Sequence, residues 1–184
     1  MLIEDPKTGH VAEVTHEGFL RVLGVAVPWQ THHSENHESA YASGNGMITM
    51  DGTDNAVFFI QNTSQTDKIF VTGMVGSTND TAGVKFSMYK GGAYTSGGTV
   101  GGAVNMNLTS RNVAENTVYY GDDMVVADGT FPIFTGYVAQ GMTQFPLGGS
   151  LILGYLDTVH VNVLGTNAKN ATVGMTYFFH GGRF

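Results

Sequence analysis

From Met47 onward the chain alternates short apolar runs with clusters of Gly, Asn, Asp, Ser and Thr. The runs are about five to eight residues long and recur about every 10–15 residues, which is the pattern of strands joined by turns. This pattern predicts an all-β fold: a sandwich, a jelly roll or a barrel. The expected strands are residues 19–27, 47–50, 56–62, 68–76, 84–91, 124–128, 130–139, 150–156, 159–165 and 171–180, with weaker candidates at 104–110 and 117–122.

Composition supports a β-protein with many turns. The chain is 42% hydrophobic and 12% charged, and its 26 glycines follow no three-residue period. At 184 residues it is long enough for one domain with a single core. We expect the strands 47–50 and 56–62 to form a hairpin across the turn DGTDN, and the glycine-rich residues 91–102 to form a flexible loop.

The first 45 residues differ from the rest. They carry five of the seven histidines, the only tryptophan and many charges, and Pro28 ends the apolar stretch 19–27. We therefore divide the chain into an N-terminal arm with the first strand, residues 1–45, and a β-sandwich body, residues 46–184. An arm beside a folded body is typical of a protein that assembles with others.

Charge and cysteine content exclude several classes of function. The net charge of −7, with eight Lys and Arg spread along the chain, argues against nucleic-acid binding, which needs clustered cations. The absence of cysteine excludes disulfides and thiolate chemistry. No basic and apolar leader is visible, and no apolar run is long enough for a membrane helix, so we expect a protein that is made in a cytoplasm and binds no membrane.

The sharpest chemical signal is a histidine group in the arm. His33 and His37 are four residues apart, the spacing that places two imidazoles on one helix face for a metal, but an HExxH pattern is absent. The alternative is a polar segment, or a contact in which symmetry gathers His32, His33 and His37 between subunits. Protonation near pH 6 would then loosen the oligomer. We expect no resident metal or other cofactor.

Other motifs have structural explanations. The acidic groups Asp51, Asp54 and Asn55, and Asp122, Asp123 and Asp128, could bind calcium, but they lack EF-hand spacing and coincide with expected turns. The GGTVGG stretch lacks the spacing of a phosphate loop, no GxSxG elbow occurs, and no carboxylate pair can be placed, so we expect no enzyme activity.

Four aromatic residues in or near loops have more than one interpretation: Trp29, Tyr94, Tyr119 and Tyr120. They could form a protein interface, where tyrosine and tryptophan are common, or a platform on which sugars stack. The third possibility is that they are ordinary core residues.

Several short motifs resemble those of a family of structural proteins from tailed-phage virions. They are D-P-x-T-G-x-x-A-x-V and G-F-L-R-V in the arm, A-Y-x-x-x-x-G-x-I-T at 40–49, the strand VFFIQNTSQTD at 57–67, and P-x-G-G-S-L-x-L-G-Y at 146–155. The resemblance touches both ends of the chain, and the stretch from about Gly91 to Phe145 departs from it most.

The resemblance implies a capsid decoration, or cement, protein: a β-sandwich of jelly-roll type that trimerises on the virion surface and clamps subunits of the major capsid protein. The arm would supply the capsid or subunit contacts. The residues expected to make them are Val11, Val14, Phe19, Leu20, Val22, Trp29, His32, His33 and His37. The alternatives are a phage tail or baseplate component, or a carbohydrate-binding module that recognises a host surface glycan.

Overall fold

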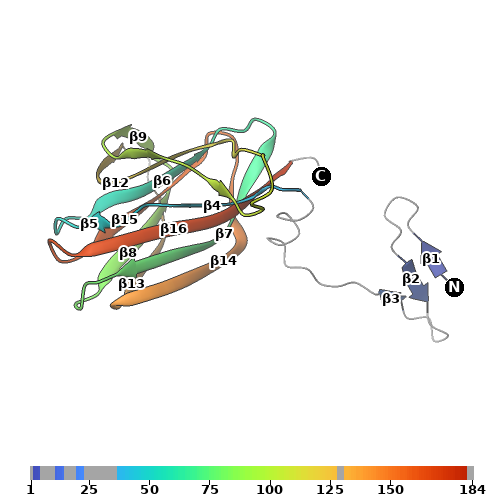
Figure 1. Cartoon of the computed structure of the whole chain (residues 1–184), viewed down its shortest axis with the longest axis horizontal. Helices are drawn as coiled ribbons and strands as arrows, with labels where there is room; N and C mark the ends of the chain where they lie inside the picture. Colours follow the sequence, from blue (N-terminus) through green and yellow to red (C-terminus); the bar gives the residue numbers. More distant parts are fainter. Residues whose placement is uncertain (1, 5–10, 15–19, 23–36, 128–130, 182–184) are drawn as a thin grey trace.

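The computed structural model describes residues 2–4, 11–14, 20–22, 37–127 and 131–181 (Figure 1). In these residues the chain forms sixteen strands and no helix, which confirms the all-β fold class. Three short strands near the N-terminus form an antiparallel sheet of order β1-β2-β3. They are β1 (Leu2–Glu4), β2 (Val11–Val14) and β3 (Leu20–Val22).

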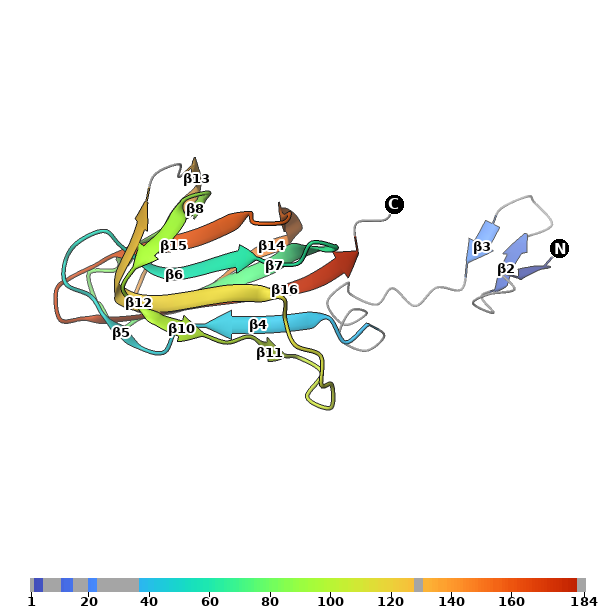
Figure 2. The same ribbon diagram turned by 90° about the horizontal axis from the view of Figure 1, so that it is seen from above.

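Strands β4 to β16 form two antiparallel sheets that pack face to face, so the expected β-sandwich is confirmed (Figures 1 and 2). One sheet has the order β10-β12-β6-β15-β8-β13, with β9 also paired to β12, and the other β11-β4-β16-β7-β14, with β5 also paired to β16. The strands are β4 (Ala40–Gly44), β5 (Ile48–Thr49), β6 (Asn55–Asn62), β7 (Asp67–Thr78), β8 (Val84–Lys90), β9 (Ala93–Ser96), β10 (Thr99–Gly101), β11 (Val104–Asn105), β12 (Asn116–Ala127), β13 (Phe131–Val138), β14 (Gly141–Leu153), β15 (Thr158–Leu164) and β16 (Asn170–Gly181).

Eight of these strands have the arrangement of a jelly roll. Strands β4, β16, β7 and β14 are neighbours in one sheet, and β6, β15, β8 and β13 are neighbours in the other. Along the chain these eight strands alternate between the sheets except from β8 to β13, and in each sheet the first strand lies beside the last. Two interlocked Greek keys of this kind make a double-sheet jelly roll.

Besides the short strand β5, the remaining strands are β9 to β12, which form an insertion between β8 and β13. In this insertion β12, with β9 and β10, extends the seven-stranded sheet beyond β6, and β11 extends the six-stranded sheet beyond β4. The insertion therefore covers one side of the sandwich. The opposite side, where β13 and β14 are the outermost strands, has no such cover among the described residues.

The core lies between the sheets and follows the two-residue alternation of strands. In β16, Ala171, Val173, Met175, Tyr177 and Phe179 are buried against apolar side chains of both sheets. Full burial of each large apolar side chain stabilises the fold by about 1.5–3 kcal/mol.

One buried hydroxyl connects the insertion to the six-stranded sheet. The Tyr177 hydroxyl lies 2.8 Å from the Ser43 hydroxyl and accepts a hydrogen bond of 2.6 Å from Asn116 Nδ2 on β12. Burial raises the pKa of Tyr177 to about 12, so the hydroxyl stays protonated over the physiological range. The contact fixes β12 against the core.

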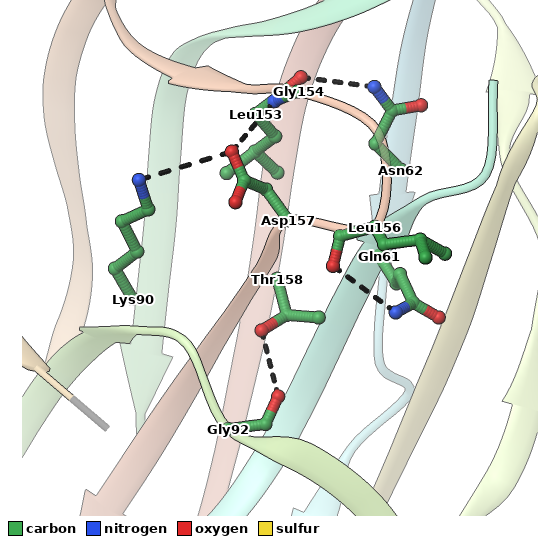
Figure 3. Close-up of polar contacts among 9 residues, drawn as sticks. All are labelled: Gln61, Asn62, Lys90, Gly92, Leu153, Gly154, Leu156, Asp157 and Thr158. Carbon is green, nitrogen blue, oxygen red and sulfur yellow. Dashed lines mark hydrogen bonds and ion pairs between the residues drawn. The ribbon is translucent and has the colours of Figure 1, made fainter. Parts of the chain in front are cut away.

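A second polar cluster joins β6 and β8 to the turn between β14 and β15 (Figure 3). The buried Asn62 donates through Nδ2 to the carbonyls of Asp67 (2.9 Å) and Leu153 (3.0 Å), and its Oδ1 accepts from the Ser64 amide (2.9 Å). At the surface, Asp157 accepts from the Gly154 amide at 2.9 Å. Asn62 therefore satisfies the backbone where three segments meet.

Two expectations near the start of the body are wrong. Strand β4 pairs with β16, so the body sheet begins at Ala40, inside the range assigned to the arm. The hairpin around DGTDN does not form, because β5 pairs with β16 and β6 belongs to the other sheet. The turn itself is present: Asp51 Oδ1 accepts from the Thr53 amide at 2.8 Å. The turn carries the chain from one sheet to the other.

The glycine-rich segment 91–102 is not a plain loop. It contains β9 and β10, which both pair with β12. Gly97 and Gly98 form the turn between them with positive φ angles, and a Cβ atom at Gly97 would overlap the Asp123 carbonyl oxygen. Glycine is required there for close approach of two backbones.

Replacement of Asn62 by alanine is expected to destabilise the fold by about 3 kcal/mol, because three hydrogen bonds are lost and buried carbonyls are left without partners. Urea unfolding of Asn62→Ala measures the change. Gln61→Ala is the matched control, since Gln61 makes one exposed hydrogen bond of 3.3 Å to the Leu156 carbonyl. Equal midpoints for the two variants would contradict the role given to Asn62.

Candidate functional site

The side of the sandwich formed by β13 and β14 is the candidate interaction surface, hereafter the open side. β13 is the edge of the seven-stranded sheet and β14 the edge of the six-stranded sheet. The two strands are consecutive, joined by Ala139 and Gln140, so both edges come together at one side of the molecule.

The open side carries no charge. No Asp, Glu, Lys, Arg or His occurs between Asp128 and Asp157, a stretch that includes both strands. Edge strands of native proteins are protected from further pairing by charged side chains, by proline, by bulges or by covering segments. The open side has proline and a bulge but no charge, so its side chains can pack against a partner without burial of charge.

Large apolar side chains are exposed on this side. Tyr137 is 79% exposed, Met142 76% and Phe131 69%, and Ile133 and Ile152 are also exposed. Ile133 and Tyr137 belong to β13, and Met142 and Ile152 belong to β14. Exposed apolar side chains on both edge strands indicate an interaction site.

Between the two edges, Phe134 and Phe145 close the core. Their ring centroids are 4.9 Å apart at 61°, and both side chains pack against the buried cluster. The open side thus has a rigid aromatic base, which a partner can bind without rearrangement of the core.

The backbone of the open side limits how a partner can bind. Pro132 and Pro146 have no N–H group to donate, and β14 bulges between Pro146 and Leu151, where Gly148 and Gly149 have positive φ angles. A foreign strand cannot extend the sheet along this whole edge. Side-chain packing is therefore the expected mode of contact.

The outer face of the seven-stranded sheet holds a second unusual feature. His160 on the central strand β15 is only 3% exposed, and its ring stacks on Tyr89 of β8 with centroids 5.0 Å apart at 11°. Burial lowers the pKa of His160, and a hydrogen bond with the backbone of Gly91 partly opposes that shift. The imidazole is neutral near pH 7.

The aromatic candidates are brought together in part. Tyr94 and Tyr119 stack on each other with centroids 3.6 Å apart at 4°, and both contact Phe59. Each ring therefore covers a face of the other, and the pair packs in a small apolar cluster with Ala56 and Met124. The stacked faces are not available to a sugar. Trp29 lies outside the described residues.

The calcium candidates have protein partners. Asp51 accepts hydrogen bonds from Thr53, which lower its pKa, Asp54 lies 3.3 Å from the ammonium of Lys85, and Asp123 accepts from the Gly98 amide at 2.7 Å. Among the described residues, no three His, Cys, Asp or Glu side chains are close enough to hold a metal ion. Asp128 lies outside these residues.

Four of the nine expected arm contacts lie outside the part of the chain that the structure describes. They are Phe19, Trp29, His32 and His33. Val11, Val14, Leu20 and Val22 lie in β2 and β3, and His37 precedes β4. Their roles at a capsid or subunit contact remain predictions.

Sequence reasoning missed both features described above. The uncharged stretch 129–156 is visible in the sequence, and its coincidence with two consecutive strands could have indicated an interface. His160 and Asn162 occur in VHVNV, where two polar residues alternate with valines, but a strand with one polar face usually places that face in water.

No protein-family model, curated protein or solved structure matches the chain. No helix within the described residues is long and apolar enough to cross a membrane.

Contact between copies of the chain through the open side would be weakened at least about tenfold in the double variant Ile133→Lys, Tyr137→Lys, because two charges would be buried in an apolar contact. Sedimentation equilibrium of the full chain measures the association. Gln65→Lys, an exposed loop position between β6 and β7, adds a charge away from the open side and should leave association unchanged. Equal association of both variants would contradict this assignment.

His160 makes stability depend on pH. Its folded pKa lies below the unfolded value of 6.5, so between the two values only the unfolded chain binds the proton. The free energy of unfolding should therefore be fully retained above pH 6.5 and fall as the pH decreases toward the folded pKa. Urea midpoints at about pH 7 and about pH 5 should differ less in His160→Phe than in the parent. An equal shift of the urea midpoint between the two pH values in both proteins would contradict the role given to His160.

Proposed function

We propose that the protein is a structural subunit of a tailed-phage virion, a decoration protein that binds across subunits of the major capsid protein and stabilises the assembled shell. The main support for a structural role is the open side, where two consecutive edge strands have exposed apolar side chains and no charged residue. The virion context rests on the sequence motifs in the arm and at 40–67 and 146–155.

The proposed mechanism is thermodynamic. A protein that binds only the assembled shell stabilises that state by mass action, in proportion to the logarithm of its concentration over the dissociation constant. Several contacts on one rigid lattice add avidity without new kinds of interaction. A jelly roll suits this role because its sheets are rigid and its edges, turns and arm are free to make contacts.

The open side and the arm have different parts in this proposal. The open side joins copies of the chain, for which a homotrimer is the expected state, by packing of Tyr137, Met142 and their neighbours. The arm, residues 1–39 once β4 is assigned to the body, contacts the capsid. The acidic chain, with net charge −7, would meet basic patches of the shell. The protein would then reside on the virion surface.

Deletion of residues 1–18 is expected to weaken capsid binding at least about tenfold while the body stays folded, since the deletion ends well before β4. The measurement mixes the protein with expanded capsids that lack it, sediments the shells and counts bound copies. The parent should saturate at a fixed ratio to the major capsid protein and raise the temperature of shell disruption.

Gln65→Lys serves as the control in the same assay and should bind as the parent does. Binding of the truncated protein at parental affinity would refute the role of the arm. Absence of binding by the parent, with its oligomer intact in solution, would refute decoration and favour a tail, baseplate or glycan-binding role.

A further inference from the structure

A pocket lies on the outer face of the seven-stranded sheet, on β6, β8, β12 and β15 and distinct from the open side. Its volume is about 400 Å³, within the range of small-molecule sites. Tyr89, His160, Asn162 and Ala56 line it from the sheet, and Met124 and Val126 line it from β12. β12 shifts register against β6 between Tyr120 and Met124, and the residues after Met124, Val125 to Ala127, pair with β9. The insertion thus supplies one wall.

Two buried polar atoms in this pocket have no hydrogen-bond partner among the described residues. They are His160 Nδ1 and Asn162 Oδ1. The large majority of buried side-chain polar atoms in proteins are hydrogen-bonded, and an atom left without a partner destabilises the fold. Two such atoms at alternate, outward-facing positions of one central strand indicate a partner beyond the described residues.

The chemistry of these two atoms limits the partner. The Asn162 side-chain oxygen accepts hydrogen bonds. Burial lowers the pKa of His160, and each nitrogen of a neutral imidazole either accepts or donates, according to the tautomer. The missing partner must therefore donate to Asn162, and a hydroxyl group, which both donates and accepts, fits both atoms.

The surroundings favour a neutral donor over a cation. Asp54 also lines the pocket, but its carboxylate lies 3.3 Å from the Lys85 ammonium, which compensates its charge. Tyr89, Met124 and Val126 offer apolar surface, and the volume far exceeds the roughly 30 Å³ of one water molecule. A ring with hydroxyl donors and apolar C–H groups combines these properties.

We propose that this pocket binds a neutral saccharide unit, whose hydroxyl groups form hydrogen bonds with His160 Nδ1 and Asn162 Oδ1 while its C–H groups contact Tyr89 and Val126. The assignment is independent of the open side and of the proposed role on the capsid. It also differs from a stacking platform of Tyr94 and Tyr119, whose stacked faces cover each other.

The test is an NMR titration of the full chain with histidine-labelled rings. The resonances of His160 are assigned by their loss in His160→Phe. The probes are glucose, galactose, mannose and N-acetylglucosamine, added separately, with methylammonium chloride as the cationic probe. At least one sugar should shift the His160 resonances saturably, and Asn162→Ala should weaken that binding about tenfold, as expected for one lost hydrogen bond.

Thr135→Val is the matched control, because Thr135 lies on the outer face of the same sheet, bonded to Ser87, and outside the pocket. It should bind the sugar as the parent does. Three results would overturn the proposal: no saturable shift with any of the four sugars, equal affinity in Asn162→Ala and the parent, or a saturable response to methylammonium alone.

Discussion

The free edges of the two sheets are the constraint on which the rest of this structure depends. A sandwich has two sides where strands end without neighbours, and backbone groups exposed there invite association. In this chain the insertion β9 to β12 lies over the side formed by β4 and β6. The side formed by β13 and β14 carries no charge and has no cover among the described residues. We propose that contact with another protein covers the exposed apolar side chains of that side.

The insertion also shapes a pocket, because different parts of β12 pair with different strands. Its first half continues the sheet beside β6, and its second half bends away to pair with β9. The bend depends on Gly121, at φ 158°, and on the tight turn at Gly97 and Gly98. Because of this bend, residues of β12 form one wall of the pocket beside the polar face of β15. One segment between β8 and β13 thus covers an edge and shapes a pocket.

Much of the fold could be predicted from the sequence. Two-residue alternation in 84–90 and 171–180 and the turn residues between runs identify strands and the sandwich, because both are local consequences of burial on one face. The insertion could not be predicted, since glycines in 91–102 serve close backbone approach, which local pattern does not distinguish from a loop. The extent of β14 was also missed, because Pro146 and two glycines at 148–149 argue against a strand except at an edge with a bulge.

The candidate sites depend on contacts between distant segments. Alternation predicts that His160 and Asn162 share a face, but only the pairing of β15 with β8 and the bend of β12 make that face buried. Hydrogen–deuterium exchange of the assembled against the dilute protein tests the central claim most directly. Protection on assembly confined to residues 131–153 would agree with contact through the open side. Protection of 99–113 instead, or unchanged exchange throughout 131–153, would contradict it.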